Sequence, residues 1–192
     1  MVTVVAVTPI KLAMLADGRS NRCGQGLTEF AIVMPLLIVM LLGVFDAGVL
    51  MFGVGTSDYA VGEGARVAAE AGNAADADAQ IIQAIQNTAL HQPFVQVTEI
   101  DIYKLNEDPV TGKLTADANG CASNPCLNKY DANGNPLTAP WASSSRNVTN
   151  GSSDFIGVII KYQYNWKSGV LLSAAPLQLN STSTVRLEPQ TY

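Results

Sequence analysis

A single apolar stretch constrains the fold of this chain more than any other part of the sequence. Residues 30–54 contain one charged side chain, Asp46. A helix that crosses a bilayer needs ~20 apolar residues, whereas the apolar region of a cleaved secretory signal is only ~7–15 residues long. A soluble core helix this apolar would need a much larger domain around it than 192 residues can build. The stretch therefore predicts a transmembrane helix, which we assign to residues 25–56.

The distribution of charge predicts how this helix is oriented. Lys11, Arg19 and Arg22 against Asp17 give residues 1–24 a charge of +2, so the remainder carries −7 of a total of −5. Because positive segments stay on the cytoplasmic side, we expect a cytoplasmic N-terminus and a periplasmic or extracellular region 57–192. Charged residues make up only 14% of the chain and form no basic face, which gives nucleic-acid binding no support.

Two carboxylates lie next to or within the apolar stretch. Glu29 directly precedes Phe30, and Asp46 follows 17 residues later. At 1.5 Å per residue the separation is about 26 Å, close to the ~30 Å hydrocarbon core, so each carboxylate can lie near one boundary of the bilayer. For Asp46, a role as an interface residue and a contact with a partner both remain open.

After the apolar stretch, residues 57–75 are expected to continue the helix. Small residues recur there at four-residue spacing, at Ala60, Gly64, Ala68 and Gly72, which places them on one face. That face can pack on the chain's own sheet or against another subunit. Arg66, three residues after Glu63, is expected to form an ion pair with it.

The rest of the chain predicts an α+β domain. Ile81, Ile82 and Ile85 give residues 78–89 an apolar helical face. Residues 95–105 are expected to form a strand, and the shift of its apolar phase between Val97 and Ile100 indicates either a bulge or an end effect. Residues 156–166 and 177–187 alternate between apolar and polar side chains, which predicts two antiparallel strands. The sheet needs a cover on its apolar face, and the helices between residues 57 and 89 are the available partners.

Residues 105–153 are polar and rich in Asn, Gly, Ser and Pro, so we expect a long loop. Asp131, Asn133 and Asn135 resemble the start of a calcium loop. However, the glycine and the last ligand of such a loop fall at the wrong positions, so an ordinary turn is the better interpretation. No metal or cofactor site is predicted. The single histidine, His91, and the lack of a Ser/His/Asp set also argue against an enzyme.

The run Gly24-Gln25-Gly26-Leu27-Thr28-Glu29-Phe30, followed by Pro35-Leu36-Leu37 and Asp46-Ala47-Gly48, is similar to known proteins. It resembles the TadE-type pseudopilins of the Tad (tight adherence) pilus system, and Glu63-Gly64-Ala65-Arg66 extends the similarity. The glycine followed five residues later by a glutamate resembles a type IV prepilin peptidase site. The resemblance is dense from Gly24 to about Ala71.

The resemblance implies cleavage between Gly24 and Gln25, which would remove residues 1–24 as a cytoplasmic leader. Glu29 and Phe30 would then act in processing and assembly, with Glu29 meeting the new N-terminal amine of a neighbouring subunit. Cleavage would also discard Cys23 and leave Cys121 and Cys126 as an even pair, suited to a disulfide in an oxidising periplasm. Asp46, Gly64 and Arg66 are candidate helix-packing or partner-contact residues.

The implied function is a structural one. The chain would be a minor pilin or pseudopilin of a Tad/Flp-type pilus, acting in pilus biogenesis, adhesion and surface attachment. Its expected partners are a prepilin peptidase, other Tad pilins and pseudopilins, the inner-membrane assembly platform and the lipid bilayer. Its expected location is the bacterial inner membrane as a single-pass protein, or the extracellular pilus. A membrane-anchored periplasmic binding or adhesive module outside the pilus is the alternative.

Overall fold

The computed structural model describes residues 22–89, 95–117, 125–168 and 175–189. The chain divides into two compact units, residues 1–40 and residues 41–192. The first unit, where described, consists of the N-terminal part of helix α1 (Arg22–Ala71). The described residues of the second unit form the rest of α1, helix α2 (Ala77–Ala89) and a six-stranded antiparallel sheet. The predicted α+β class is confirmed.

The strands of the sheet are β1 (Val95–Glu107), β2 (Leu114–Ala116), β3 (Leu127–Asp131), β4 (Pro136–Thr138), β5 (Phe155–Tyr164) and β6 (Leu177–Arg186). Their order is β4-β3-β1-β5-β6, and β2 pairs with the C-terminal end of β1. The predicted antiparallel pair is present as β5 and β6, which pair over ten residues from Phe155↔Arg186 to Tyr164↔Leu177. Of the two alternatives for the phase shift in β1, the structure has the bulge, as a register shift between Val97 and Glu99.

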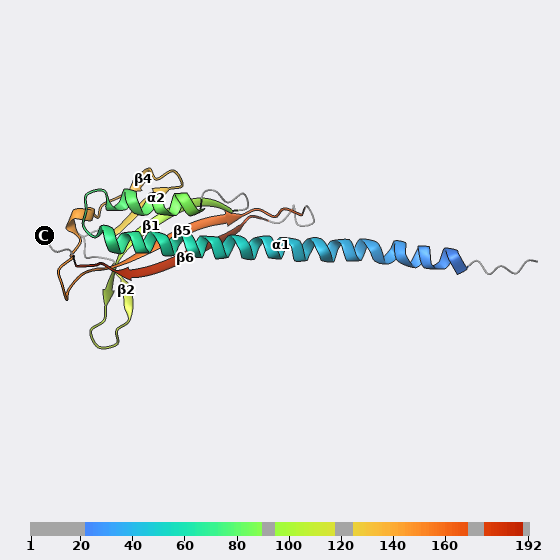
Figure 1. Ribbon diagram of the computed structural model, residues 1–192, viewed down its shortest axis with the longest axis horizontal. Helices are drawn as coiled ribbons and strands as arrows, with labels where there is room; N and C mark the ends of the chain where they lie inside the picture. The colour runs from blue at the N-terminus through green and yellow to red at the C-terminus, as the bar shows by residue number, and fades with distance from the viewer. Residues whose placement is uncertain (1–21, 90–94, 118–124, 169–174, 190–192) are drawn as a thin grey trace, which may run out of the picture. The chain divides into compact units, whose positions relative to one another are not determined.

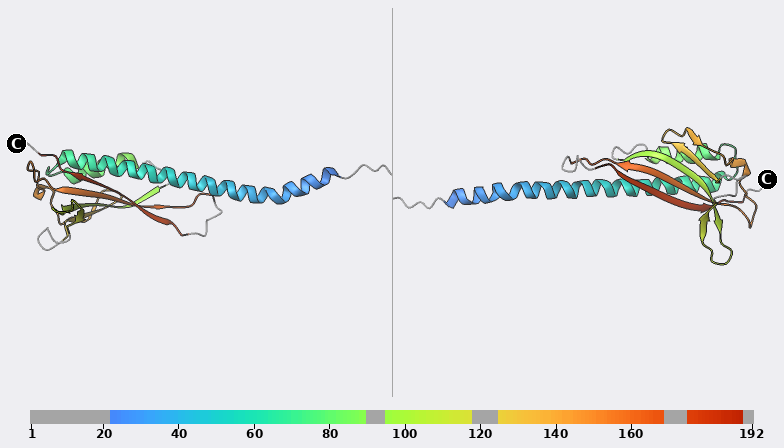
Figure 2. Two further views of the ribbon diagram at one scale, coloured as in Figure 1. Left: turned by 90° about the horizontal axis from the view of Figure 1, so that it is seen from below. Right: turned by 180° about the vertical axis from the view of Figure 1, so that it is seen from behind.

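The helices cover one face of the sheet. Figure 1 shows α2 beside the C-terminal part of α1, and both views in Figure 2 place this pair on the same face of the strands. Ile81 and Ile85 of α2 and Ile100 and Ile160 of the sheet are fully buried between the layers, together with Ala60 of α1. The apolar face predicted for residues 78–89 is therefore the face that closes the core.

The prediction of a long loop over residues 105–153 was wrong. The segment contains β2, β3, β4 and the short helix η1 (Ser143–Ser145). The strands could not be recognised in the sequence because some of the side chains that are buried in the fold are polar. Asn128 of β3 is 1% exposed. The Asn128 side chain donates a hydrogen bond of 2.7 Å to the Trp141 carbonyl oxygen and accepts one of 2.9 Å from the Trp141 backbone N–H.

Two turns mark the ends of a helix and of a strand. Helix α1 ends at Ala71, four residues earlier than expected, and Gly72 follows with φ of 54°. Such a left-handed residue just past a helix is a common stop, and glycine adopts it without strain. Between β3 and β4, Asp131 accepts bonds from the backbone N–H groups of Asn133 and Asn135. The suspected calcium loop is thus a tight turn stabilised by its own carboxylate.

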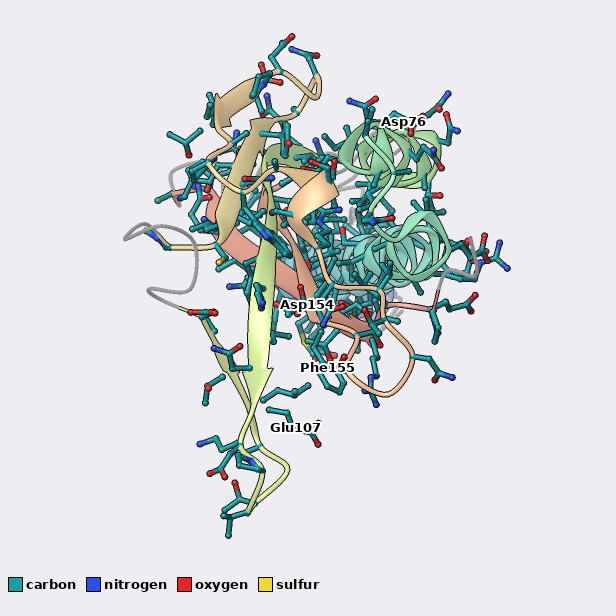
Figure 3. The ribbon with its side chains drawn as sticks, turned by 90° about the vertical axis from the view of Figure 1, so that its left-hand side faces the viewer. Asp76, Glu107, Asp154 and Phe155 are labelled. Carbon is teal, nitrogen blue, oxygen red and sulfur yellow. The ribbon has the colours of Figure 1, made fainter. Side chains whose placement is uncertain are left out.

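The far end of β1 and β2 form a two-stranded arm. Their pairing runs from Leu105↔Ala116 to Glu107↔Leu114. In Figure 3 the arm, with Glu107 labelled, extends away from the layer of strands on which the helices pack. At its tip Val110 is 90% exposed.

Candidate processing and assembly site

The predicted cleavage site lies in the first turn of α1. The helix begins at Arg22, and Gly24 is exposed within it. A Cβ added to Gly24 would meet no atom within 4 Å, and Thr28 Oγ1 donates a 3.3 Å hydrogen bond to the Gly24 carbonyl oxygen. Because the first four N–H groups of a helix lack intrahelical partners, this turn can unwind at small cost to present the Gly24–Gln25 bond.

The helix that follows is exposed on all sides within the first unit. Glu29 is exposed, as is Phe30 at 60%. The neighbouring apolar side chains Leu27 and Ile32 are 72% and 77% exposed. A helix of this length and hydropathy is long and apolar enough to cross a membrane, and an apolar surface of this kind is stable only when lipid or another helix covers it.

Asp46 has a partner within its own chain. The side chain is almost fully buried, with 1% of the residue exposed. Its Oδ1 accepts bonds from the backbone N–H groups of Lys167 (3.2 Å) and Ser168 (3.1 Å), and its Oδ2 accepts one of 2.5 Å from Ser168 Oγ. The Tyr164 hydroxyl donates to the Asp46 carbonyl oxygen at 3.3 Å. The carboxylate thus ties α1 to the segment that leaves β5.

Two further polar contacts tie α1 to the sheet nearer its C-terminus. Ser181 Oγ of β6 donates a 2.5 Å bond to Asp58 Oδ1, and the Tyr162 hydroxyl lies 3.3 Å from the same Oγ. Beyond β6, the backbone N–H of Glu188 donates to the Ala69 carbonyl oxygen at 3.1 Å. These contacts were not anticipated, because their partners lie more than 100 residues apart and share no local pattern.

Gly64 and Arg66 are the other two candidates for helix packing or partner contact. Gly64 is packed between α1 and α2. A Cβ there would approach Ile85 Cγ1 to 2.7 Å. Arg66 has a side chain that is 67% exposed and lies 3.5 Å from Glu63 and 3.9 Å from Glu70. The expected ion pair with Glu63 is present, and such exposed pairs contribute little to stability.

The cysteines are only partly described. Cys126 is buried and disulfide-bonded, while Cys121 lies outside the described residues, as does His91. The pairing of Cys121 with Cys126 therefore stays a prediction. Within the described residues, no group of three or more His, Cys, Asp or Glu side chains is placed to hold a metal ion.

Among the described residues, one long apolar helix is followed by the sheet domain, which fits the class of single-pass membrane proteins. Within that class, residues 24–66 match the family model of the TadE-like proteins, which confirms the resemblance over this region. The match begins at Gly24, ends inside α1, and links the chain to Tad pilus-associated proteins. No curated protein and no solved structure matches the chain.

Proposed function

We propose that this protein is a non-enzymatic pseudopilin of a Tad-type pilus, cut by a prepilin peptidase between Gly24 and Gln25. The family match from Gly24 onward is the observation that carries the proposal. An exposed glycine in the first helical turn, with open space around its Cα, supports it because a peptidase must approach that backbone closely. The mature protein would begin at Gln25 and keep Glu29 as an assembly residue.

We also propose that the membrane span ends near Phe45 rather than at Thr56. Asp46 is hydrogen-bonded to residues 167 and 168, which lie outside any helix or strand. Non-helical backbone cannot face lipid in the hydrocarbon core because its polar groups would lack partners. Residues 26–45 would still cover about 30 Å as a helix, which matches the ~30 Å core. The sheet would then lie directly at the outer surface of the inner membrane, with the N-terminus cytoplasmic.

The experiment is N-terminal sequencing and intact mass of the protein from cells with and without a prepilin peptidase. Cleavage is expected to give a chain that starts at Gln25 only when the peptidase is present. Gly24→Leu should leave the full-length band, since a bulky side chain blocks the approach, whereas Gly26→Leu is the matched control two residues downstream and should still be cut. An uncleaved wild-type chain in the presence of the peptidase would refute the processing role.

A second role has one observation in its favour. The arm formed by β1 and β2 projects beyond the core and carries the 90% exposed Val110 at its tip. This geometry suits a binding or adhesive module, either in the pilus or in the membrane. Deleting residues 108–113 and joining the strands by a two-residue turn should abolish surface attachment but not cleavage. Attachment equal to that of the wild type would remove this candidate.

A further inference from the structure

From the end of the proposed membrane span at Phe45 onward, the outward face of α1 carries a seven-residue repeat of aromatic side chains and glycines. The three aromatic side chains are more than half exposed, and a Cβ on any of the three glycines would meet no atom within 4 Å. We call this face the aromatic–glycine seam; it consists of Phe45, Gly48, Phe52, Gly55, Tyr59 and Gly62.

The seam is turned away from the sheet. Gly55 and Gly64 are nine residues apart, which at 3.6 residues per turn places them on opposite sides of the helix. Gly64 packs against Ile85 in the core, so Gly55 points away from it. The fold of the second unit leaves the seam uncovered.

Lipid cannot cover the whole seam. Asp46 lies at the proposed end of the membrane span, and Tyr59 follows 13 residues later, about 20 Å further along the helix. Tyr59 is nevertheless 62% exposed and Phe52 is 59% exposed. Glycine inside an exposed helix is also unfavourable relative to alanine, so the seam lowers the stability of the isolated chain in two ways.

We propose that the aromatic–glycine seam pairs with the same seam of a second copy of this chain, as a parallel, left-handed helix pair. A seven-residue repeat keeps one face toward a partner helix when the two supercoil. Rings and glycines alternate on the same face, so in an in-register pair each ring packs beside its own copy and next to the partner's glycines. One hollow is directly visible, about 310 Å³ at Gly48 between Phe45 and Phe52.

The charge pattern and the anchor favour this occupant. The seam residues carry no charge, so pairing two copies buries no charged seam side chain. The two carboxylates in the same stretch, Asp46 and Asp58, are hydrogen-bonded to Ser168 and Ser181 of the chain's own domain. Two copies anchored in one membrane by the same helix enter it from the same side, which makes the pair parallel. The inference rests on the proposed membrane span but not on cleavage at Gly24.

The test is cysteine cross-linking of the full chain in membranes of expressing cells. In a parallel two-fold pair, each seam residue faces its own copy, so Phe52→Cys and Gly55→Cys should each give a disulfide-linked dimer under mild oxidation. Ala47→Cys is the matched control, because Ala47 is also exposed but lies about 100° around the helix from Gly48. It should give no more dimer than the wild type.

A second variant tests the hollow itself. Gly55→Leu has open space in the single chain, so its Tm should not fall. In the pair it would overpack the seam, and cross-linking through Phe52→Cys should drop about tenfold or more. Equal dimer from Phe52→Cys and Ala47→Cys, or no dimer from either seam variant, would overturn the proposal, as would undiminished cross-linking in Gly55→Leu. Cleavage at Gly24 is scored in the same samples, so its failure is seen separately from failure of the seam.

Discussion

Two glycines of α1 that are only two residues apart should respond in opposite ways to the same substitution. A Cβ on Gly62 would meet no atom within 4 Å, whereas a Cβ on Gly64 would lie 2.7 Å from Cγ1 and 2.9 Å from Cδ1 of Ile85. Ile85 is fully buried and cannot move into solvent. Gly62→Ala and Gly64→Ala therefore form a matched pair in one helix.

The magnitudes follow from these contacts. Alanine is favoured over glycine inside a helix by about 0.8–1 kcal/mol, so Gly62→Ala should raise the free energy of unfolding by roughly that amount. Gly64→Ala has the same propensity gain but adds a methyl group to a filled site, which typically costs about 1–3 kcal/mol. The two variants should therefore differ in the free energy of unfolding by about 1–3 kcal/mol, with Gly64→Ala the less stable.

The assay is thermal unfolding followed by circular dichroism, in detergent and at a dilution where the chain is monomeric. In a domain of this size each 1 kcal/mol shifts the Tm by about 2–4 °C. Ile85→Ala removes both contacting atoms, so the cost of Gly64→Ala should shrink in that background. Equal Tm shifts in Gly62→Ala and Gly64→Ala, or a Gly64→Ala cost that Ile85→Ala leaves unchanged, would refute the packing argument.

Three further perturbations have expected outcomes. Asp78→Ala should lower the free energy of unfolding in urea by about 3–5 kcal/mol, because it leaves the fully buried guanidinium of Arg146 without its carboxylate; a loss below 1 kcal/mol would contradict this. The pKa of Glu99 is lowered from 4.5 to about 2 because Lys161 and Lys129 donate hydrogen bonds to its carboxylate. The contribution of Glu99 to stability is therefore present above pH 4.5 and is lost as the pH falls toward 2. Glu99→Gln should make the Tm fall less steeply between pH 4.5 and 2. A Tm that falls as steeply as in the wild type would count against a stabilising role of Glu99 and its two lysines. Asp46→Ala should leave membrane insertion intact but speed tryptic cleavage after residue 167, since the carboxylate no longer holds the segment after β5; a cleavage rate equal to that of the wild type would exclude this role.

The parts of the fold that were predictable are those in which side-chain period and burial agree. In β5, the apolar residues Ile156, Val158 and Ile160 alternate along the strand and are all fully buried. The bulge in β1 was visible as a change of phase, because a one-residue slip moves every side chain to the other face.

The strands inside residues 105–153 could not be predicted because their interior is partly polar. Asp78, at the start of α2, accepts bonds from Asn128 (2.8 Å) and Tyr130 (2.7 Å) and pairs with Arg146. The Arg146 guanidinium also lies 4.6 Å from the ring centre of Trp141. Such a network is recognisable only once its members are brought together, since each residue alone is typical of a turn or loop.

The small-residue face of α1 shows how the tertiary contacts decide between two hypotheses that the sequence left open. Ala60, Gly64 and Ala68 were compatible with packing on the chain's own sheet or with an inter-subunit seam. Asp46, Asp58 and Ala69 each bond to the sheet side of the same domain. These contacts fix the rotation of the helix about its axis.

With that rotation fixed, α2 and the sheet occupy the small-residue face, and Ala60 and Ala68 are fully buried there. That face is therefore unavailable to another subunit. A partner that contacts α1 beside the sheet is left with the exposed sides of the helix, which include Phe52, Gly55 and Tyr59. The polar contacts that anchor α1 thus also determine which surface this protein can offer for assembly.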